Sequence, residues 1–248
     1  MNKLFFSWPQ KNRALPVICV CVGQVIWGFS YLFTRIAQSS ASPTVVLSMR
    51  FLASWVIMTA LIWSGKKSFS LKGKNFRPLL ALALLEPPYY FFESYGVYYS
   101  NATFAGTVMA FAPVVGILAA MLFLGEKPTR RQKIFSLLPT AGVIIITSVG
   151  SSMGIVKPLG AIFLFASQIV AAGMKLYNKK SSEEFSSFER TYAIVVANAI
   201  IFTIKSMIDL HGDVRAYAAP LGNPEYVFAL VVLCLFCSIA ANLLVNYA

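Results

Sequence analysis

Two acidic residues in an otherwise apolar stretch are the strongest candidates for chemistry. Glu86 lies near the middle of residues 78–98, and Glu93 follows seven positions later. Residues seven apart share one face of a helix, and Tyr89 and Tyr90 lie between them. Such a carboxyl can contact a cation or an amine, or take up a proton. The alternative is a protonated carboxyl bonded to a neighbouring helix; both interpretations stay open for Glu86, and the structural one is favoured for Glu93.

A pair of prolines, Pro87 and Pro88, directly follows Glu86. Proline lacks the backbone N–H and clashes with the preceding helical turn, so the helix is expected to kink or open here. An opened helix would place free carbonyl groups beside the acid, as at transporter binding sites. A static bend that improves packing is the alternative. Pro113, in a later apolar stretch, permits the same two interpretations.

Aromatic and amide side chains form a second candidate group. Gln24, Trp27 and Tyr31 fall on one broad face of residues 15–37, and Gln168 resembles Gln24 in its local sequence. Aromatic rings beside amides suit contact with a planar or hydrophobic ligand. Ordinary packing is the alternative.

Polar residues also recur every four positions near the end of the chain, at Ser238, Asn242 and Asn246. They predict one polar stripe on a helix, either lining a cavity or hydrogen-bonding to a neighbouring helix. Arg50, about two turns into residues 44–64, is expected to extend its side chain to the lipid headgroups. Steering of anions towards a cavity is the alternative for Arg50.

Enzymatic chemistry finds little support among these residues. His211 is the single histidine, and no metal-ligand partner lies near it in the sequence. The sequence contains no H-E-x-x-H, G-x-S-x-G or P-loop motif, so we predict neither a metalloprotease, a serine hydrolase nor direct use of ATP. Cys19, Cys21, Cys234 and Cys237 lie within apolar stretches and are interpreted as small buried hydrophobes. We predict no enzyme activity, cofactor or metal site.

The composition identifies the elements that must position these residues. Of the 248 residues, 58% are hydrophobic and only 12% are charged, and the mean hydropathy is +0.70. A soluble domain has about 25% charged residues, so this chain is a polytopic membrane protein. Apolar stretches that reach or approach the roughly 20 residues of a spanning helix lie at 15–37, 44–64, 78–98, 103–124, 134–149, 158–177, 191–208 and 226–248. The first is longer than the core of a signal peptide and is interpreted as a retained helix.

The net charge of +12 reflects membrane orientation rather than nucleic-acid binding. Connections 38–43 and 100–101 carry no charge, and 150–157 carries one. Basic residues gather before the first stretch and in the alternate connections: Lys3, Lys11, Arg13; Lys66, Lys67, Lys72, Lys74, Arg77; Lys127, Arg130, Arg131, Lys133; Lys179, Lys180, Arg190. The positive-inside rule therefore predicts a cytoplasmic N-terminus.

Short similarities between the two halves of the chain indicate an internal repeat. Residues 23–25 (GQV) correspond to 167–169 (SQI), and 48–51 (SMRF) to 188–191 (FERT). Tyr95 then corresponds to Tyr247. Five predicted helices separate the two copies, and an odd number inverts the second copy relative to the first.

Several of these residues together resemble the EamA repeat of the drug/metabolite transporter superfamily. The resemblance rests on Trp27-Gly28, Arg50-Phe51, Ala102-Thr103, Pro113 and Gly125-Glu126, followed by Ala141-Gly142-Val143. It implies ten helices in two inverted five-helix repeats, a bacterial inner membrane, and movement of small organic solutes, often outward.

We therefore predict an all-α polytopic membrane protein with eight transmembrane helices. Residues 1–14 form a cytoplasmic segment, 15–149 a complete five-helix EamA repeat, and 150–248 the first three helices of an inverted second repeat. The ninth and tenth family helices would follow residue 248, so the chain is expected to be short by about two helices. The alternative function is a non-transporting scaffold, or a subunit completed by a partner.

The predicted function is secondary transport of amino acids, metabolites or drugs, with export as the expected direction, by alternating access around a midplane cavity. The predicted partners are a small-molecule solute and the lipid bilayer, without nucleic acid; proton coupling and a homodimer are left open. The predicted substrate-binding residues are Gln24, Trp27, Tyr31, Glu86, Tyr89, Tyr90, Glu93, Gln168, Ser238 and Asn242.

Overall fold

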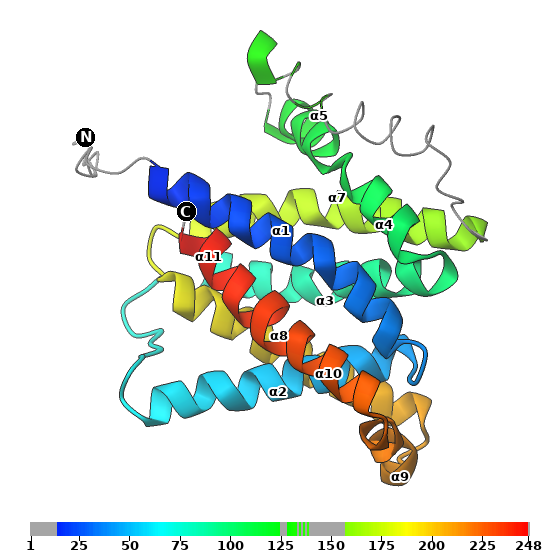
Figure 1. Cartoon of the computed structure of the whole chain (residues 1–248). Helices are drawn as coiled ribbons and strands as arrows, with labels where there is room; N and C mark the ends of the chain where they lie inside the picture. The colour runs from blue at the N-terminus through cyan, green and yellow to red at the C-terminus, as the bar shows by residue number, and fades with distance from the viewer. Residues whose placement is uncertain are drawn as a thin grey trace.

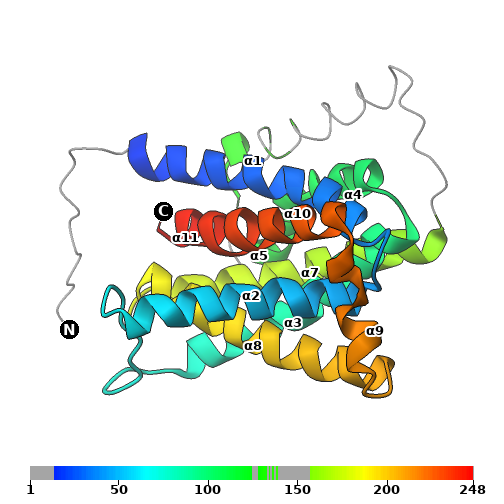
Figure 2. The same cartoon turned by 60° about the horizontal axis from the view of Figure 1, so that its bottom comes forward.

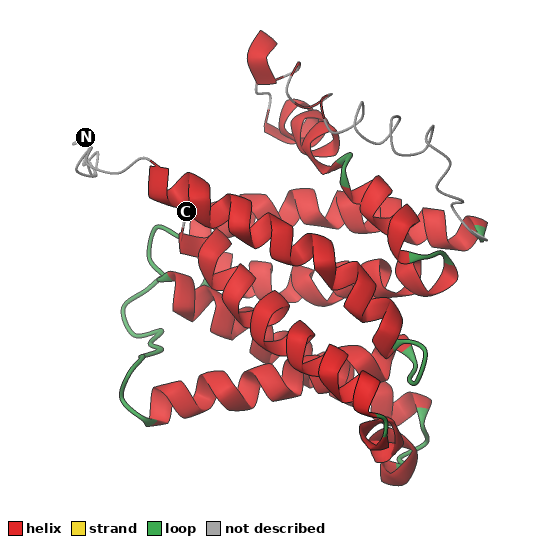
Figure 3. Ribbon diagram, viewed as in Figure 1, coloured by secondary structure: helices red, strands yellow, loops and turns green. Residues whose placement is uncertain are grey.

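The computed structural model describes residues 14–124, 128–132, 134, 136, 138 and 157–247. Within these residues the chain is helical and contains no strand (Figure 3). In chain order the elements are α1 (Ala14–Ala37), α2 (Pro43–Trp63), α3 (Arg77–Tyr99), α4 (Ala102–Met109), α5 (Ala112–Leu124), α7 (Pro158–Ser181), α8 (Ser187–Asp209), α9 (Val214–Ala218), η2 (Ala219–Gly222), α10 (Pro224–Val232), η3 (Leu233–Ala240) and α11 (Ala241–Tyr247).

Five of the described helices are long and apolar enough to cross a membrane. They are α1, α2, α7, α8 and the continuous run Pro224–Tyr247, which joins α10, η3 and α11. These five agree with predicted spans, and they support a multi-pass membrane protein. The predicted total of eight stays a prediction, because most of the fifth predicted span, 134–149, lies outside the described residues, as does nearly all of the predicted segment 1–14.

The long helices pack as three pairs of neighbours. α3 packs along α7, α2 along α8, and α1 along the run from α10 to α11. The views in Figures 1 and 2 agree on the closeness of α1 to α10 and α11. α4 and α5 pack against α7, and α4 also contacts α1. This arrangement places α1, α3, α7 and α11 around the centre of the bundle, where the candidate residues of the sequence lie.

The prolines affect the two predicted kink sites differently. The fourth predicted span is interrupted, because α4 ends at Met109 and α5 begins at Ala112, immediately before Pro113. In contrast, α3 runs as one helix through Pro87 and Pro88. The expectation that the helix opens beside Glu86 is therefore wrong: the remaining backbone hydrogen bonds and the packing on α7 and α8 keep α3 continuous.

A deformation that the sequence did not predict lies in the last membrane-spanning run. Residues Leu233–Ala240 form a π-helix between two α-helical segments. The π-helix is rare and occurs mostly as single-turn insertions within α-helices, which are frequent at functional sites. The carbonyl oxygen of Cys237, within this segment, accepts a hydrogen bond from Trp27 Nε1 at 3.1 Å. A side chain of α1 thus binds a backbone group of the π-helix.

The start of α8 is fixed by a capping box. Ser186 Oγ accepts from the backbone N–H of Glu189, and the Glu189 carboxylate accepts from the backbone N–H of Ser186. The same carboxylate forms an ion pair with Lys74 at 2.6 Å, which ties the α2–α3 connection to α8. Arg190, assigned above to the basic connection, lies inside α8 and is buried. The helix begins earlier than the apolar stretch because the cap, rather than hydropathy, sets its first residue.

Candidate functional site

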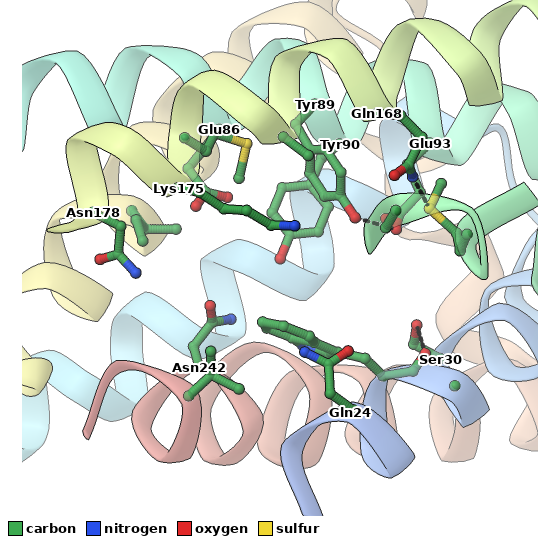
Figure 4. A pocket seen from close by; sticks show the side chains of 18 of the residues that line it. Gln24, Ser30, Glu86, Tyr89, Tyr90, Glu93, Gln168, Lys175, Asn178 and Asn242 are labelled. Atoms are coloured by element: carbon green, nitrogen blue, oxygen red, sulfur yellow. Dashed lines mark hydrogen bonds between the residues drawn. The ribbon is translucent and has the colours of Figure 1, made fainter. Parts of the chain in front are cut away.

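A cavity of about 380 Å³ opens between the central helices. In Figure 4, Glu86, Tyr89, Tyr90 and Lys175 lie on one side of it, and Gln24 and Asn242 lie across from them. All but one of the predicted site residues line the cavity: Gln24, Trp27 and Tyr31 from α1; Glu86, Tyr89, Tyr90 and Glu93 from α3; Gln168 from α7; and Asn242 from α11. Residues far apart in the sequence therefore share one cavity.

The carboxylate of Glu93 is bound by two tyrosines. Its Oε1 accepts hydrogen bonds from Tyr89 Oη at 2.7 Å and from Tyr31 Oη at 3.2 Å. The bond from Tyr31 joins α1 to α3 across the cavity wall. The bond from Tyr31 agrees with the structural interpretation favoured for Glu93, in which the carboxyl group is bonded to a neighbouring helix.

The carboxylate of Glu86 has a different environment. The residue is 5% exposed and lines the cavity. Among the described residues, no side chain or backbone group hydrogen-bonds to it or forms an ion pair with it. An acid buried in an apolar bundle without a partner is energetically costly. The alternative interpretation of Glu86, a carboxyl bonded to a neighbouring helix, is therefore not what the structure contains.

Arg50 turns inward, so the expected extension to the headgroups is wrong. Its side chain is 3% exposed, and Nε donates to Ser238 Oγ at 2.6 Å. The guanidinium carbon lies 5.2 Å from the ring centre of Tyr90 and 5.3 Å from that of Phe51, within cation–π range. These contacts hold Arg50 in the cavity wall, because the face of α2 that carries it packs inside the bundle rather than against lipid.

Ser238 is the predicted site residue that does not line the cavity. It is fully buried, with 0% exposure, and its hydroxyl accepts from Arg50. The residue acts on the cavity through Arg50. The polar stripe of Ser238, Asn242 and Asn246 is thus divided, because only the two asparagines reach the cavity.

Lys175 is a cavity residue that the sequence reasoning missed. It projects from α7 (Figure 4) and forms no ion pair with any residue that the structure describes. Its Nζ lies beside Gly116 of α5, where a Cβ would be 3.6 Å away, an ordinary van der Waals distance. A lysine within the predicted span 158–177 was the available signal, since intramembrane cations usually face a cavity.

A polar network lies at one end of the cavity. Asn178 Nδ2 donates to Asn246 Oδ1 at 2.9 Å, and Asn246 Nδ2 donates to Thr191 Oγ1 at 2.9 Å. Arg190 donates to Asn178 Oδ1 at 2.7 Å and also to the backbone oxygen of Asn246. The network joins α7, α8 and α11, and its two asparagines line the cavity.

Two further amides of the cavity, Gln168 and Asn242, have partners of their own. Gln168 Nε2 contacts Met109 Sδ, and Asn242 Nδ2 donates to the backbone oxygen of Ser238 at 3.1 Å. In the residues that the structure describes, no group of three or more His, Cys, Asp or Glu side chains could hold a metal ion. The chemistry available in the cavity is therefore that of charged groups, amides and aromatic rings.

Comparison with known proteins identifies the family. Residues 14–148 match the EamA-like transporter family. The "Uncharacterized transporter YcxC" of Bacillus subtilis is 30% identical over 242 residues, covering 96% of this chain and 78% of the relative. An "Uncharacterized transporter" of Archaeoglobus fulgidus is 22% identical over 202 residues, covering 80% and 71%. The inner membrane transporter YedA of Escherichia coli is 25% identical over 185 residues, covering 74% and 59%. The chain belongs to the EamA-like transporter family of the drug/metabolite transporter superfamily.

Proposed function

We propose that this protein is a secondary transporter that moves small organic solutes by alternating access around the central cavity. The observation that carries the proposal is the cavity itself: charged and polar groups of several helices converge on about 380 Å³ inside an apolar bundle. Binding sites for small molecules measure about 300–1,000 Å³. Ionisable residues within a membrane usually mark the path of a substrate or an ion.

The pattern of neighbouring helices supports the inverted repeat. The predicted repeat relates α1 to α7, α2 to α8, and α3 to the run from α10 to α11. If each helix is replaced by the one to which the repeat relates it, the neighbouring helices α3 and α7 become the run from α10 to α11 and α1. The pair of α2 and α8 is unchanged by this replacement. All three neighbour relations occur in the bundle. Rocking of one repeat against the other is the movement expected of such a fold, and export is the direction that the family resemblance implies.

We further propose that α1 begins on the cytoplasmic side. The start of α1, the α2–α3 connection and the α7–α8 connection lie at one end of the bundle (Figure 1). Lys66, Lys67, Lys179 and Lys180 lie in or beside these connections. Cysteine substitutions at Lys67 and at Ser39, in the opposite connection, test the orientation: a membrane-impermeant maleimide added to intact cells should label only the second.

Transport is tested with the full chain in proteoliposomes, by a counterflow screen across amino acids, amines, carboxylates and uncharged metabolites. We expect Glu86→Gln to lower the flux of the transported solute by about tenfold or more and to flatten its dependence on pH if a proton is coupled. Glu225→Gln, at an exposed residue, is the matched control. Unchanged flux and unchanged pH dependence in Glu86→Gln would remove Glu86 from the mechanism, and movement of no solute would overturn the proposed function.

A further inference from the structure

The outer end of the Arg50 guanidinium has no hydrogen-bond partner among the residues that the structure describes, and its contacts there are with the rings of Phe51 and Tyr90. Within the described residues, its side chain makes one hydrogen bond, from Nε to Ser238 Oγ at 2.6 Å. The N–H groups on Nη1 and Nη2 remain free, although Arg50 is 3% exposed and lines the cavity. A guanidinium stays charged at any physiological pH, so the cavity contains a buried cation with unused donors.

Among the described residues, no carboxylate forms an ion pair with this cation, and Glu86 and Glu93 act on it only at longer range. The ion pairs between described residues join Lys74 to Glu189 and Lys205 to Asp209, and neither involves Arg50. A buried charge without a counter-ion is costly. An anionic ligand at Arg50 would therefore be attracted by the positive charge and would accept hydrogen bonds from the N–H groups that are still free. Two parallel N–H donors match the two oxygens of a carboxylate in bidentate geometry.

Glu86 supplies the opposite charge in the same cavity when its carboxyl group is ionised. Its carboxylate is also unpaired among the described residues and 5% exposed. A carboxylate accepts hydrogen bonds from an ammonium group. Glu93 is less suited to this role, since Tyr89 and Tyr31 already donate to it.

Lys175 is the second unpaired cation of the cavity and the competing candidate for an anion. It differs from Arg50 in mobility and exposure: its side chain is long and exposed, whereas Ser238, Phe51 and Tyr90 hold Arg50 in place. A fixed donor loses less conformational entropy on binding than a mobile one. Arg50 is therefore the better anchor for a carboxylate.

From this arrangement we propose that the solute is a zwitterion of the amino-acid type, whose carboxylate binds Arg50 and whose ammonium binds Glu86. The inference rests on the proposed transport function and names the class of solute. Trp27, Tyr31 and Tyr89, which also line the cavity, would contact the remaining apolar part of the solute.

The first test compares compounds that share one skeleton. Counterflow is measured with the twenty protein amino acids, and the most rapidly exchanged one is then set against its two truncated analogues as competitors. For leucine these are 3-methylbutylamine, which lacks the carboxylate, and 4-methylpentanoate, which lacks the ammonium; for phenylalanine they are 2-phenylethylamine and 3-phenylpropanoate. Each analogue is expected to compete about tenfold or more weakly than the amino acid, because one buried charge of the protein stays unpaired.

The second test assigns each charge to its residue. Arg50→Gln should weaken the binding of the amino acid by about tenfold or more. The same substitution should change the binding of the amine analogue by less than about twofold. Glu86→Gln should also weaken the binding of the amino acid, but it should leave the binding of the carboxylate analogue nearly unchanged. Lys205→Gln, at a half-buried residue of α8 that pairs with Asp209 and does not line the cavity, is the control for loss of a cation. Arg50→Lys keeps the buried charge without the bidentate geometry, so an intermediate loss is expected in a variant whose folding is less disturbed.

The outcomes separate this inference from the proposed function. If the broad library yields movement only of uncharged or singly charged solutes, the transporter stands and the zwitterion is wrong. The assignment to Arg50 is overturned if Arg50→Gln weakens the binding of an amino acid and of its amine analogue equally. It is also overturned if Lys175→Gln, rather than Arg50→Gln, removes the preference for compounds with a carboxylate. If no solute moves at all, the proposed function fails first.

Discussion

The two helix pairs on either side of the cavity are built differently. Where α3 meets α7, backbone approaches backbone at Gly160, because a Cβ there would lie 2.9 Å from the carbonyl carbon of Tyr99. A Cβ at Gly96 would lie 2.6 Å from the side-chain Cγ of Leu164 and 3.2 Å from its backbone nitrogen. Where α1 meets α11, a Cβ at Gly23 would lie 2.7 Å from Val245 Cγ2, and its nearest backbone atom, Ala241 O, is 3.4 Å away. The first contact is fixed by main chain, and the second by side chains that can repack.

The helices of these pairs also differ in regularity. α3 carries two internal prolines and remains one α-helix, whereas the run from α10 to α11 has no proline after Pro224 and contains a π-helix. Trp27 binds the Cys237 carbonyl oxygen of that segment, and Ser238, also within it, binds Arg50. The comparison teaches that contacts with neighbouring helices, rather than proline, accompany the deformation of this helix. It assigns the rigid wall to α3 and α7, and the adjustable wall to α1 and the last helix.

The largest effect on stability is expected at the rigid wall. Gly160→Ala places a methyl group against the main chain of Tyr99, which has no rotamer to change, so we expect a loss of about 2–3 kcal/mol in the free energy of unfolding. Thermal unfolding of the purified protein in detergent measures it. Gly222→Ala, where a Cβ meets no atom within 4 Å, is the control. An unchanged midpoint for Gly160→Ala would contradict the rigid contact.

A pair of compensation experiments sharpens the contrast. Gly23→Ala should lower the free energy of unfolding by about 1–2 kcal/mol. Adding Val245→Ala removes the clashing Cγ2, so it should restore most of the stability that overpacking took away. Gly96→Ala with Leu164→Ala should recover less, since the Leu164 backbone nitrogen would still lie 3.2 Å from the new Cβ. Each single variant is measured beside its double variant, so that the cost of Val245→Ala or Leu164→Ala alone can be subtracted. Equal recovery in both pairs would mean that the two walls do not differ.

A smaller effect is expected from the bond between α1 and the π-helix. Trp27→Phe removes the Nε1 donor and leaves the Cys237 carbonyl oxygen without it, which should cost about 0.6–1.5 kcal/mol. Trp63→Phe is the matched control, because Trp63 is 86% exposed. The unfolding midpoints of both variants are compared in the same detergent, and a larger shift for Trp63→Phe would argue against the role of this bond.

The smallest effect is expected at the second proline of α3. Pro88 is exposed on a continuous helix, and Pro88→Ala restores a backbone donor without altering the cavity wall. The free energy of unfolding should change by no more than about 0.5 kcal/mol, with transport unchanged in the counterflow assay. A marked loss of transport would show that the proline shapes the site after all.

The sequence alone predicted most of the polar and aromatic residues that were found to line the cavity, because charge in an apolar stretch is a strong signal. Glu86 and Tyr90 were assigned to a cavity from their spacing on one helix, and both line it. The four-residue spacing was misleading for Ser238, which does not line the cavity, because a π-helix changes the register that this spacing assumes. Lys175 was overlooked close to the end of its stretch, where basic residues usually mark the membrane boundary.

Hydropathy, charge placement and helical period are local properties, and they determined that this chain forms apolar helices, that its acids need a polar environment, and which side chains share a face. The direction of Arg50, the bond from Trp27 to the π-helix and the close approach at Gly160 depend on which helix covers which face. That choice is made when residues distant in the sequence pack together, because a helical period shows which residues point the same way and not what they meet. The tertiary structure alone therefore decided that an arginine two turns from a helix end faces the cavity instead of the lipid.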